Sequence, residues 1–351
     1  MEKEYSFLGL FAQFIGDSYK GKRLKPNGQK IKPQTVDNYQ YVYNLLDEFV
    51  SSRNYDLRIR PVNKMDKRKL RVEVNYWRKF YRSFSEFLYK ERNCFDNYVG
   101  MVFKTIRTFF NYLRKDRLIV VGDFHQHFYI KKEEVPIVTL MPEQLQFLIG
   151  NSEFEQSLPL ALKRTKDFFV LGCTVALRCS DVLNLRFRDI EEKNGQYYLS
   201  AKSIKTETIT RIKLPAYAIE IINRQNRKRR NNDFIFKGIC KSQINKNIRR
   251  LIELAGWTYT VGKLRKKDGK DVELKTTGNK QFYRFCDLMS SHAMRRTAIT
   301  TMLMLGMPEH VVRKISGHSG NSKAFYRYVN FVQSYLDNEI DKVHDKLEKM
   351  N

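Results

Sequence analysis

Residues 315–330 read ISGHSGNSKAFYRYVN, in which a Gly-His pair is followed by two tyrosines two positions apart. On a helix, residues two apart point about 200° from each other, so Tyr326 and Tyr328 cannot both face one pocket. A tyrosine is usually a packing residue with a polar tip, and a lone His318 is more often a turn residue than a catalyst. The role of this segment therefore depends on what else the chain carries.

The upstream segment ALRCSDVLNL (176–185) places an arginine among small and apolar residues. A guanidinium in such a setting needs an anionic partner, because burying an unpaired charge is costly. Asp181 lies three residues after Arg178 and offers a structural ion pair, and Ser180 is predicted to cap a helix. Taken alone, this segment favours a buried ion pair over catalysis.

A third segment, SSHAMRRTAITTML (290–303), is predicted to be a helix that begins with a serine cap. His292 and Arg295 are three residues apart and therefore share one face of that helix, while Arg296 points elsewhere. A neutral donor and acceptor beside a permanent cation can hold a phosphate. An ordinary surface pair fits the same pattern equally well.

The whole chain is strongly basic, with a formal net charge of +27 over 351 residues. So large an excess opposes compaction by self-repulsion and indicates a polyanionic partner. Basic runs recur along the chain and do not form a terminal tail: DKRKLR (66–71), NRQNRKRRNN (223–232), NIRRL (247–251) and VGKLRKKDGK (261–270). Nucleic acid is favoured over an acidic membrane face, since no lipidation signal supports the membrane alternative.

Composition disfavours several other classes of protein. The five cysteines are scattered, form no CxxC pair and have no histidine at zinc-finger spacing, so we expect reduced thiols, no metal site and no cofactor. No apolar run approaches the roughly 18 residues that span a bilayer, and the acidic N-terminal residues do not resemble a signal peptide. These features predict a soluble cytoplasmic protein, associated with the nucleoid and with no membrane partner.

Hydrophobic periodicity predicts that the N-terminal third is helical. Residues 35–50, 72–92 and 97–118 carry apolar and aromatic residues at three- and four-residue steps, and Thr35 can cap the first of these helices. We interpret the aromatics as core and not as base-stacking residues. The polar, turn-rich and basic loop at 20–33 suits contact with a phosphate backbone.

The rest of the chain is predicted to be helical with a small antiparallel β-sheet, so the fold class is mainly α. An extended, proline-bearing linker is expected at 128–138, and a capped helix follows from Thr139–Pro142. Alternating residues in 195–215 are typical of the strands of the small sheet. Residues 334–350 form an amphipathic pattern with a narrow apolar stripe, which favours a partner surface.

In this order, ALRCSD, HAMRRT, a Gly-His pair and a tyrosine about ten residues later resemble the tyrosine recombinase (phage integrase) family. That family's signature is an arginine, a lysine on a β-hairpin, His-x-x-Arg, a His or Trp, and a nucleophilic tyrosine. Residues 164–185 and 314–329, and less specifically 95–116, look like the integrases of Bacteroidetes mobile elements. The resemblance covers nearly the whole chain.

The resemblance implies a domain division as well as an activity. A helical, SAM-like core-type DNA-binding domain would occupy 1–127, a linker 128–138, and an α+β catalytic domain 139–332. The C-terminal helix at 333–351 would dock on a neighbouring protomer. No separate domain is apparent before the core-binding one, which weakly suggests a simpler reaction such as inversion or resolution, or a compact integrase.

Carried over by position, the resemblance implies an arginine pair and two histidines: Arg178, Arg295, His292 and His318. The family's hairpin lysine would be Lys205, in SIKTETITRIKLP. The hairpin is about two residues longer than is usual in the family, so Lys202 is the alternative.

The tyrosine departs from the family by one position. The usual spacing of nine from the second histidine would fall on Arg327. The family's SFLKYIK-type run aligns with AFYRYVN, which implies that Tyr328 is the nucleophile and that Tyr326 is a core residue; one extra residue in the HSGNSK loop explains the offset. Tyr326 remains the alternative nucleophile.

These residue types suit phosphoryl transfer at a DNA phosphodiester. Two fork-shaped guanidiniums can stabilise the charge that builds on the non-bridging oxygens, without a metal ion. A histidine can accept the tyrosine's proton and a lysine can protonate the departing 5′ oxygen. The product would be a 3′-phosphotyrosine linkage, which keeps the bond energy for rejoining.

The implied function is site-specific DNA recombination by integration, excision or inversion. Its partners would be double-stranded DNA with inverted-repeat core sites and three further protomers in a homo-tetramer on two duplexes. A DNA-bending accessory protein is a further expected partner. The alternatives are a type IB topoisomerase-like enzyme and a catalytically silent DNA-binding protein of the same fold. The residues expected to contact DNA are Lys20, Lys22, Arg23, Lys25, Lys104, Arg107, Lys131, Lys132, Lys246 and Arg249.

Overall fold

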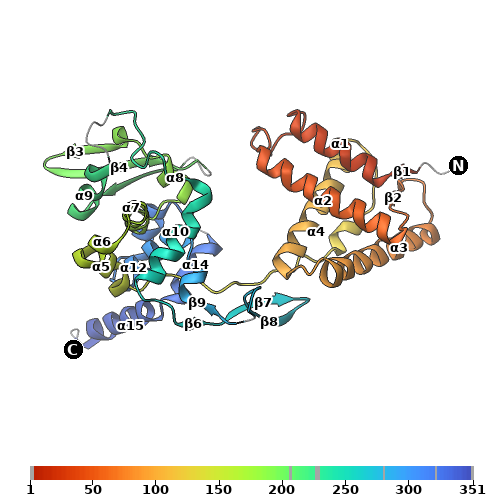
Figure 1. Ribbon diagram of the computed structural model, residues 1–351. Helices are drawn as coiled ribbons and strands as arrows, with labels where there is room; N and C mark the ends of the chain where they lie inside the picture. Colours follow the sequence, from red (N-terminus) through yellow and green to blue (C-terminus); the bar gives the residue numbers. More distant parts are fainter. Residues whose placement is uncertain (1–3, 205–207, 226–229, 280, 321, 349–351) are drawn as a thin grey trace. The chain divides into compact units, whose positions relative to one another are not determined.

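The computed structural model describes residues 4–204, 208–225, 230–279, 281–320 and 322–348 (Figure 1). The chain forms two compact units: Met1–Val135 with Leu264–Glu273, and Pro136–Lys263 with Leu274–Asn351. None of the helices within the described ranges is both long and apolar enough to cross a membrane. The two units are described in turn.

The first unit is built from four long helices. They are α1 (Phe7–Tyr19), α2 (Pro33–Arg53), α3 (Lys67–Glu86) and α4 (Asp96–Lys115). The short π-helical turn η1 (Phe87–Glu91) connects α3 to α4, and the 3₁₀ turn η2 (Asp123–His127) follows α4. Strands β1 (Tyr5–Ser6) and β2 (Arg58–Ile59) pair antiparallel beside them. The helices expected in this region are confirmed, but Thr35 is not a cap: α2 begins two residues earlier, with Pro33 at its first position and Lys32 as N-cap.

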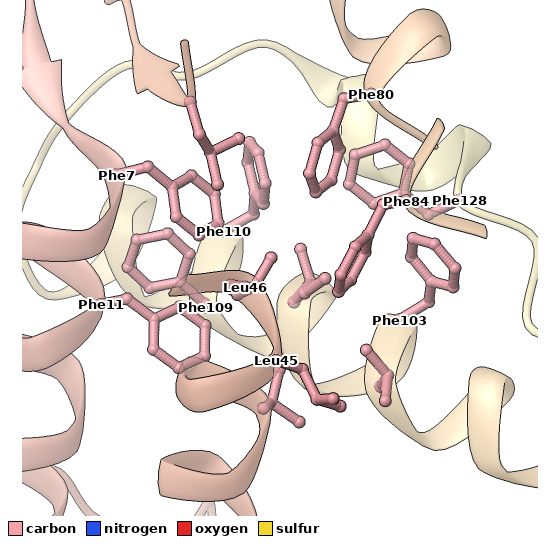
Figure 2. Packing of buried hydrophobic residues seen from close by; sticks show 14 of the residues in the cluster. Phe7, Phe11, Leu45, Leu46, Phe80, Phe84, Phe103, Phe109, Phe110 and Phe128 are labelled. Carbon is pink, nitrogen blue, oxygen red and sulfur yellow. The ribbon is translucent and has the colours of Figure 1, made fainter. Parts of the chain in front are cut away.

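Phenylalanine rings fill the core of this unit, as Figure 2 shows. The rings come from all four long helices and from Phe128, which follows η2, and they pack largely edge to face. For example, the Phe7 and Phe109 ring centroids are 4.8 Å apart at 62°. Such geometry adds about 0.5–1.5 kcal/mol per pair to the burial of apolar area. The aromatics of these helices therefore form a core, as the periodicity predicted.

A hairpin from late in the sequence belongs to this first unit. It consists of β7 (Lys263–Lys267) and β8 (Lys270–Leu274), and its turn residues Asp268 and Gly269 both have positive φ (52° and 79°), as in a type I′ turn. The buried Glu133 carboxylate accepts from Arg265 Nε at 2.9 Å and from the backbone N–H of Lys266. The sequence indicated only a basic run at 261–270. The catalytic domain was expected as one continuous segment, 139–332, whereas Leu264–Glu273 within that segment belong to the first unit.

The second unit surrounds the buried helix α7 (Leu160–Val175), against which α5 (Pro142–Gly150), α9 (Ala216–Gln225), α10 (Lys241–Leu254) and α12 (Ser291–Met304) pack. Helix α12 comes close to α7 because Gly172 has no side chain; a Cβ there would lie 2.6 Å from Met294 Sδ. The other elements of the unit are α6 (Ser152–Ser157), α8 (Cys179–Leu183), η3 (Phe187–Asp189), β6 (Thr260–Val261), β9 (Tyr283–Arg284), α11 (Phe285–Leu288), α13 (Glu309–Ser316), α14 (Lys323–Phe331) and α15 (Gln333–Glu348).

The predicted small sheet is confirmed as three antiparallel strands. They are β3 (Ile190–Lys193), β4 (Gln196–Lys202) and β5 (Ile209–Lys213), in that order. Leu199 and Ile212 face each other across β4 and β5 and are buried against the helices. The fold is therefore mainly α with small antiparallel sheets, as expected.

Two predicted helix caps in this unit, Thr139 and Ser180, are wrong; the first concerns α5. Helix α5 starts at Pro142 with Met141 as its N-cap, so Thr139 does not cap it. The Thr139 hydroxyl is instead buried beside α12, 2.9 Å from Thr297 Oγ1 and 3.1 Å from Thr300 Oγ1. A partner 158 residues away in the sequence satisfies this hydroxyl, which no local pattern indicates.

Candidate active site

Arg295 lies at the centre of a cluster of polar side chains in the second unit. Its Nη1 donates to the Ala176 carbonyl at 2.8 Å, and its Nη2 lies 3.3 Å from both ring nitrogens of His318. Ala176 ends α7 in a left-handed conformation (φ 53°), which turns its carbonyl group into the site. Burial, and then the nearby charge of Arg178, lower the pKa of Arg295 to about 10, so the guanidinium stays charged at neutral pH.

Arg178 and Asp181 both contact the residues that directly follow strand β4. Arg178 is itself the N-cap of α8, so Ser180 lies inside the helix and is not the predicted cap. Arg178 Nη1 donates to Ser203 Oγ at 3.0 Å, and Asp181 Oδ1 accepts from the Ile204 N–H at 3.1 Å. The ion pair considered from the sequence is therefore replaced by two contacts to residues 203–204.

His318 follows helix α13 through the left-handed Gly317 (φ 61°). Its Nδ1 lies 2.8 Å from Ser316 Oγ, which already donates to the Val312 carbonyl at 2.6 Å. Nδ1–H is therefore the donor to Ser316, which leaves Nε2 to accept from Arg295. Burial, followed by the charge of Arg295 and other arginines, lowers the pKa of His318 to about 4, so the ring is neutral at pH 7.

The two tyrosines of α14 lie on different sides, as their spacing predicted. Tyr328 is half-buried, with its ring centroid 6.0 Å from that of His318, and a negative charge on its oxygen would favour the charged form of Arg295. The prediction that Tyr326 is a core residue is wrong: its side chain is 50% exposed, and the Arg313 guanidinium lies 4.7 Å from the Tyr326 ring centroid. Tyr328 is therefore the tyrosine that joins the cluster of arginines and histidine.

The expected catalytic lysine, Lys205, lies outside the described residues. The residues on either side of it are at the site: the Ser203 N–H donates to the Thr208 carbonyl at 2.9 Å, and a Cβ built on Gly317 would lie 3.6 Å from Thr208 Oγ1. The alternative, Lys202, is the last residue of β4 and its side chain is exposed.

His292 occupies the first turn of α12, one turn before Arg295. The helix has Ser290 as its N-cap residue, although the serine side chain makes no capping hydrogen bond. The His292 side chain is exposed, in contrast to the half-buried His318. The two histidines therefore have different surroundings, one open to solvent and the other held among arginines.

The residues expected to contact DNA are divided between the two units, with Lys246 and Arg249 on α10 of the second. Three of those in the first unit take part in intramolecular side-chain contacts, one of them Lys25, whose Nζ donates to Gln29 Oε1 at 3.5 Å. Arg23 lies 4.7 Å from the Phe14 ring centroid, and Lys131 pairs with Asp268 at the hairpin turn. Lys25 and Arg107 are half-buried, and the remaining six are exposed: Lys20, Lys22, Lys104, Lys132, Lys246 and Arg249.

Sequence reasoning missed Arg313, which is 7% exposed and next to the cluster. Its Nε donates to Glu309 at 2.6 Å, and its Nη1 to the Gly320 carbonyl at 3.0 Å. The only local signal is a glutamate four residues earlier, which is typical of an exposed helix pair. Nothing in the sequence around Arg313 distinguishes it from a surface residue.

Solved structures of integrases and recombinases share this fold. The chain matches the Tn1549 transposon integrase in complex with circular intermediate DNA at a TM-score of 0.57 and 15% identity, over 97% of this chain and 100% of that one. It matches the XerH recombinase bound to its difH substrate at a TM-score of 0.56 and 14% identity, over 92% of each chain. A lambda integrase dimer bound to a core site matches at 0.55 and 11% identity, over 93% of this chain and 77% of that one.

Sequence comparison points in the same direction. Transposase B from transposon Tn554 of Staphylococcus aureus (strain Mu50) is 37% identical over 71 residues, which is 20% of this chain and only 10% of that protein. The model of the phage integrase family matches residues 139–333, which contain the whole cluster around Arg295. The family model therefore matches more than half of the sequence, and the chain belongs to the phage integrase family.

Proposed function

We propose that this protein is a site-specific DNA recombinase that cuts and rejoins DNA through a 3′-phosphotyrosine intermediate. The observation that carries the proposal is the cluster in which Arg178, Arg295 and His318 gather beside the half-buried phenol of Tyr328. Burial and proximity to Arg178 make the uncompensated charge of Arg295 costly, and a DNA phosphate would supply the missing anion.

The proposed reaction is an in-line transfer at phosphorus. Tyr328 attacks the phosphodiester, a P–O bond forms to the phenol oxygen, and the bond to the 5′ oxygen breaks. The two guanidiniums stabilise the charge on the non-bridging oxygens, since they remain cationic and are already oriented before the substrate binds. Reversing the same step with a different 5′ hydroxyl rejoins the strand, so no external energy source is needed.

Protons move at both ends of that step. His292, exposed at the N-terminal turn of α12, is positioned in our proposal to take the phenol proton. His318, as a neutral ring, accepts a hydrogen bond from Arg295 through Nε2. Lys205 would protonate the leaving 5′ oxygen. Its assignment is supported by the contacts that its flanking residues, Ser203 and Thr208, make with the site.

The wider assembly is also a proposal. The core-type DNA-binding domain, expected at 1–127, would lie in the first unit, and most of the catalytic domain, expected at 139–332, in the second. The protein would act as a tetramer on inverted-repeat sites. A lambda integrase tetramer has been solved bound to a Holliday junction. On α15, the large apolar side chains Ile340, Val343 and Leu347 are exposed, which supports docking of this helix on a neighbouring protomer. The proposal also includes a DNA-bending partner protein and a cytoplasmic location in association with the nucleoid.

Covalent trapping tests the reaction. Purified protein is mixed with nicked duplexes from the flanks of its own gene, and denaturing gels reveal a protein–DNA adduct. We expect the adduct with the unsubstituted protein and with Tyr326→Phe, which is the matched control, and none with Tyr328→Phe. An adduct lost only in Tyr326→Phe would refute the tyrosine assignment but keep the reaction; tight DNA binding without any adduct would refute the reaction.

A further inference from the structure

Arg313 is a buried cation that the proposed chemistry leaves without a role. It lies on α13 and is only 7% exposed. Besides its ion pair with Glu309, its Nη1 donates to two backbone carbonyls, of Ser319 at 3.3 Å and of Gly320 at 3.0 Å. Ser319 and Gly320 directly follow His318, so the guanidinium holds the loop that leaves the histidine.

The same guanidinium also contacts the helix that carries the candidate nucleophile. Its central carbon lies 4.2 Å from the ring centroid of Phe325 and 4.7 Å from that of Tyr326, both on α14. The backbone carbonyl of Arg313 accepts the N–H of His318 at 2.9 Å. One residue therefore touches His318, the loop after it and the helix that bears Tyr328.

The geometry of the tyrosine depends on those contacts. The Tyr328 ring centroid is 6.0 Å from that of His318 and 6.0 Å from that of Phe325, the ring on which Arg313 lies. We propose that Arg313 is a positioning residue: by joining the loop after His318 to Phe325 and Tyr326, it fixes the distance between Tyr328 and the arginine–histidine cluster. This inference rests on the proposed function.

A purely structural role would not require an arginine here. An apolar side chain could fill the space between α13 and Phe325 without the cost of burying a charge. The planar fork adds direction, because it donates to two successive carbonyls while its face lies on an aromatic ring. In-line attack is sensitive to such placement: a shift of about 1 Å in a reacting group can cost roughly a hundredfold in rate.

The test compares Arg313→Met with Lys314→Gln, which removes a charge from the next residue, an exposed one. Single-turnover cleavage of the nicked duplex is measured at saturating DNA, together with DNA affinity and Tm. We expect Arg313→Met to cleave at least about tenfold more slowly, with an affinity within about twofold, while Lys314→Gln keeps the rate of the unsubstituted protein. Equal rates for Arg313→Met and the unsubstituted protein would overturn the inference.

A double-substitution cycle separates positioning from general destabilisation. If Arg313 acts through Phe325, then Arg313→Met combined with Phe325→Leu slows cleavage no more than Arg313→Met alone; additive losses would overturn the inference. Should Arg313→Met not fold, Arg313→Lys takes its place, and an unchanged cleavage rate would then be the refuting result. Absence of an adduct from the unsubstituted protein would instead overturn the proposed function, and the inference with it.

Discussion

The buried carboxylate of Glu133 is predicted to hold the β7–β8 hairpin on the first unit. Its side chain is 1% exposed and accepts from Arg265 Nε at 2.9 Å and Nη2 at 2.6 Å, and from the Lys266 N–H. Breaking a fully buried ion pair costs about 3–5 kcal/mol. The Arg265 side chain is 23% exposed and glutamine keeps one acceptor oxygen, so we expect Glu133→Gln to cost about 2 kcal/mol.

Native-state hydrogen exchange measures that cost directly. Opening of the hairpin exposes the amides of residues 264–273, and about 2 kcal/mol corresponds to roughly a thirtyfold loss of protection. The adjacent Glu134 is exposed and provides the control, since Glu134→Gln should leave the same amides protected. Equal protection in Glu133→Gln and Glu134→Gln would refute the assignment of Glu133 as the anchor.

The pH dependence of the same contact has a definite sign. Burial alone would raise the pKa of Glu133, but the donors from Arg265 and Lys266 outweigh it and hold the pKa below its ordinary value. A carboxyl group whose pKa is lowered by folding stabilises the fold above its unfolded pKa and loses that contribution as the pH falls. After correction for intrinsic exchange, hairpin protection should decrease below about pH 4 in the unsubstituted protein and not in Glu133→Gln.

Three further predictions concern other parts of the chain. Thr297→Val should lower the free energy of unfolding, measured in urea, by about 1–3 kcal/mol, because it leaves the buried Leu140 N–H without its acceptor. The control Thr301→Val should cost almost nothing, since the buried Thr301 hydroxyl has no hydrogen-bond partner among the described residues. Gly100→Ala should lower the Tm, since its Cβ would lie 2.2 Å from the Lys131 carbonyl oxygen; an unchanged Tm would contradict this packing. The NMR signals of the His318 ring protons should titrate with a midpoint near pH 4 in DNA-free protein, and a midpoint near 6.5 would contradict the burial described. Because folding lowers the pKa of His318, the free energy of unfolding should fall as the pH drops from about 6.5 towards 4.

Local patterns predicted much of the fold. Helices α2, α3 and α4 of the first unit followed from apolar and aromatic residues at three- and four-residue steps, because one face of each helix must be buried. Helix α1 was not predicted. The small sheet followed from alternation in 195–215. The type I′ turn at Asp268–Gly269 also had a local signal, an Asp-Gly pair, but the surrounding basic run was interpreted only as charge.

Helix starts were less predictable than helices. Thr139 and Ser180 both have hydroxyls suited to capping, yet Thr139 bonds to α12 and Ser180 lies inside α8. Propensity ranks residues that can cap, but a long-range partner for the same hydroxyl can stabilise a different start. These errors affect residue positions by two or three places and leave the helices themselves intact.

The sequence alone determined the chemical types of the candidate site and their order, because an arginine, a His-x-x-Arg, a Gly-His pair and a tyrosine can be recognised without knowing what they touch. Helical geometry predicted that only one of the two tyrosines can join the cluster, since residues two apart cannot share a face, and the family resemblance implied that it is Tyr328. Only the tertiary structure decided that Arg178 bonds Ser203 and not Asp181, that Arg313 is buried, and that the pKa of His318 is lowered. Those properties arise from burial and from charges far apart in the sequence, so they exist only once the chain has folded.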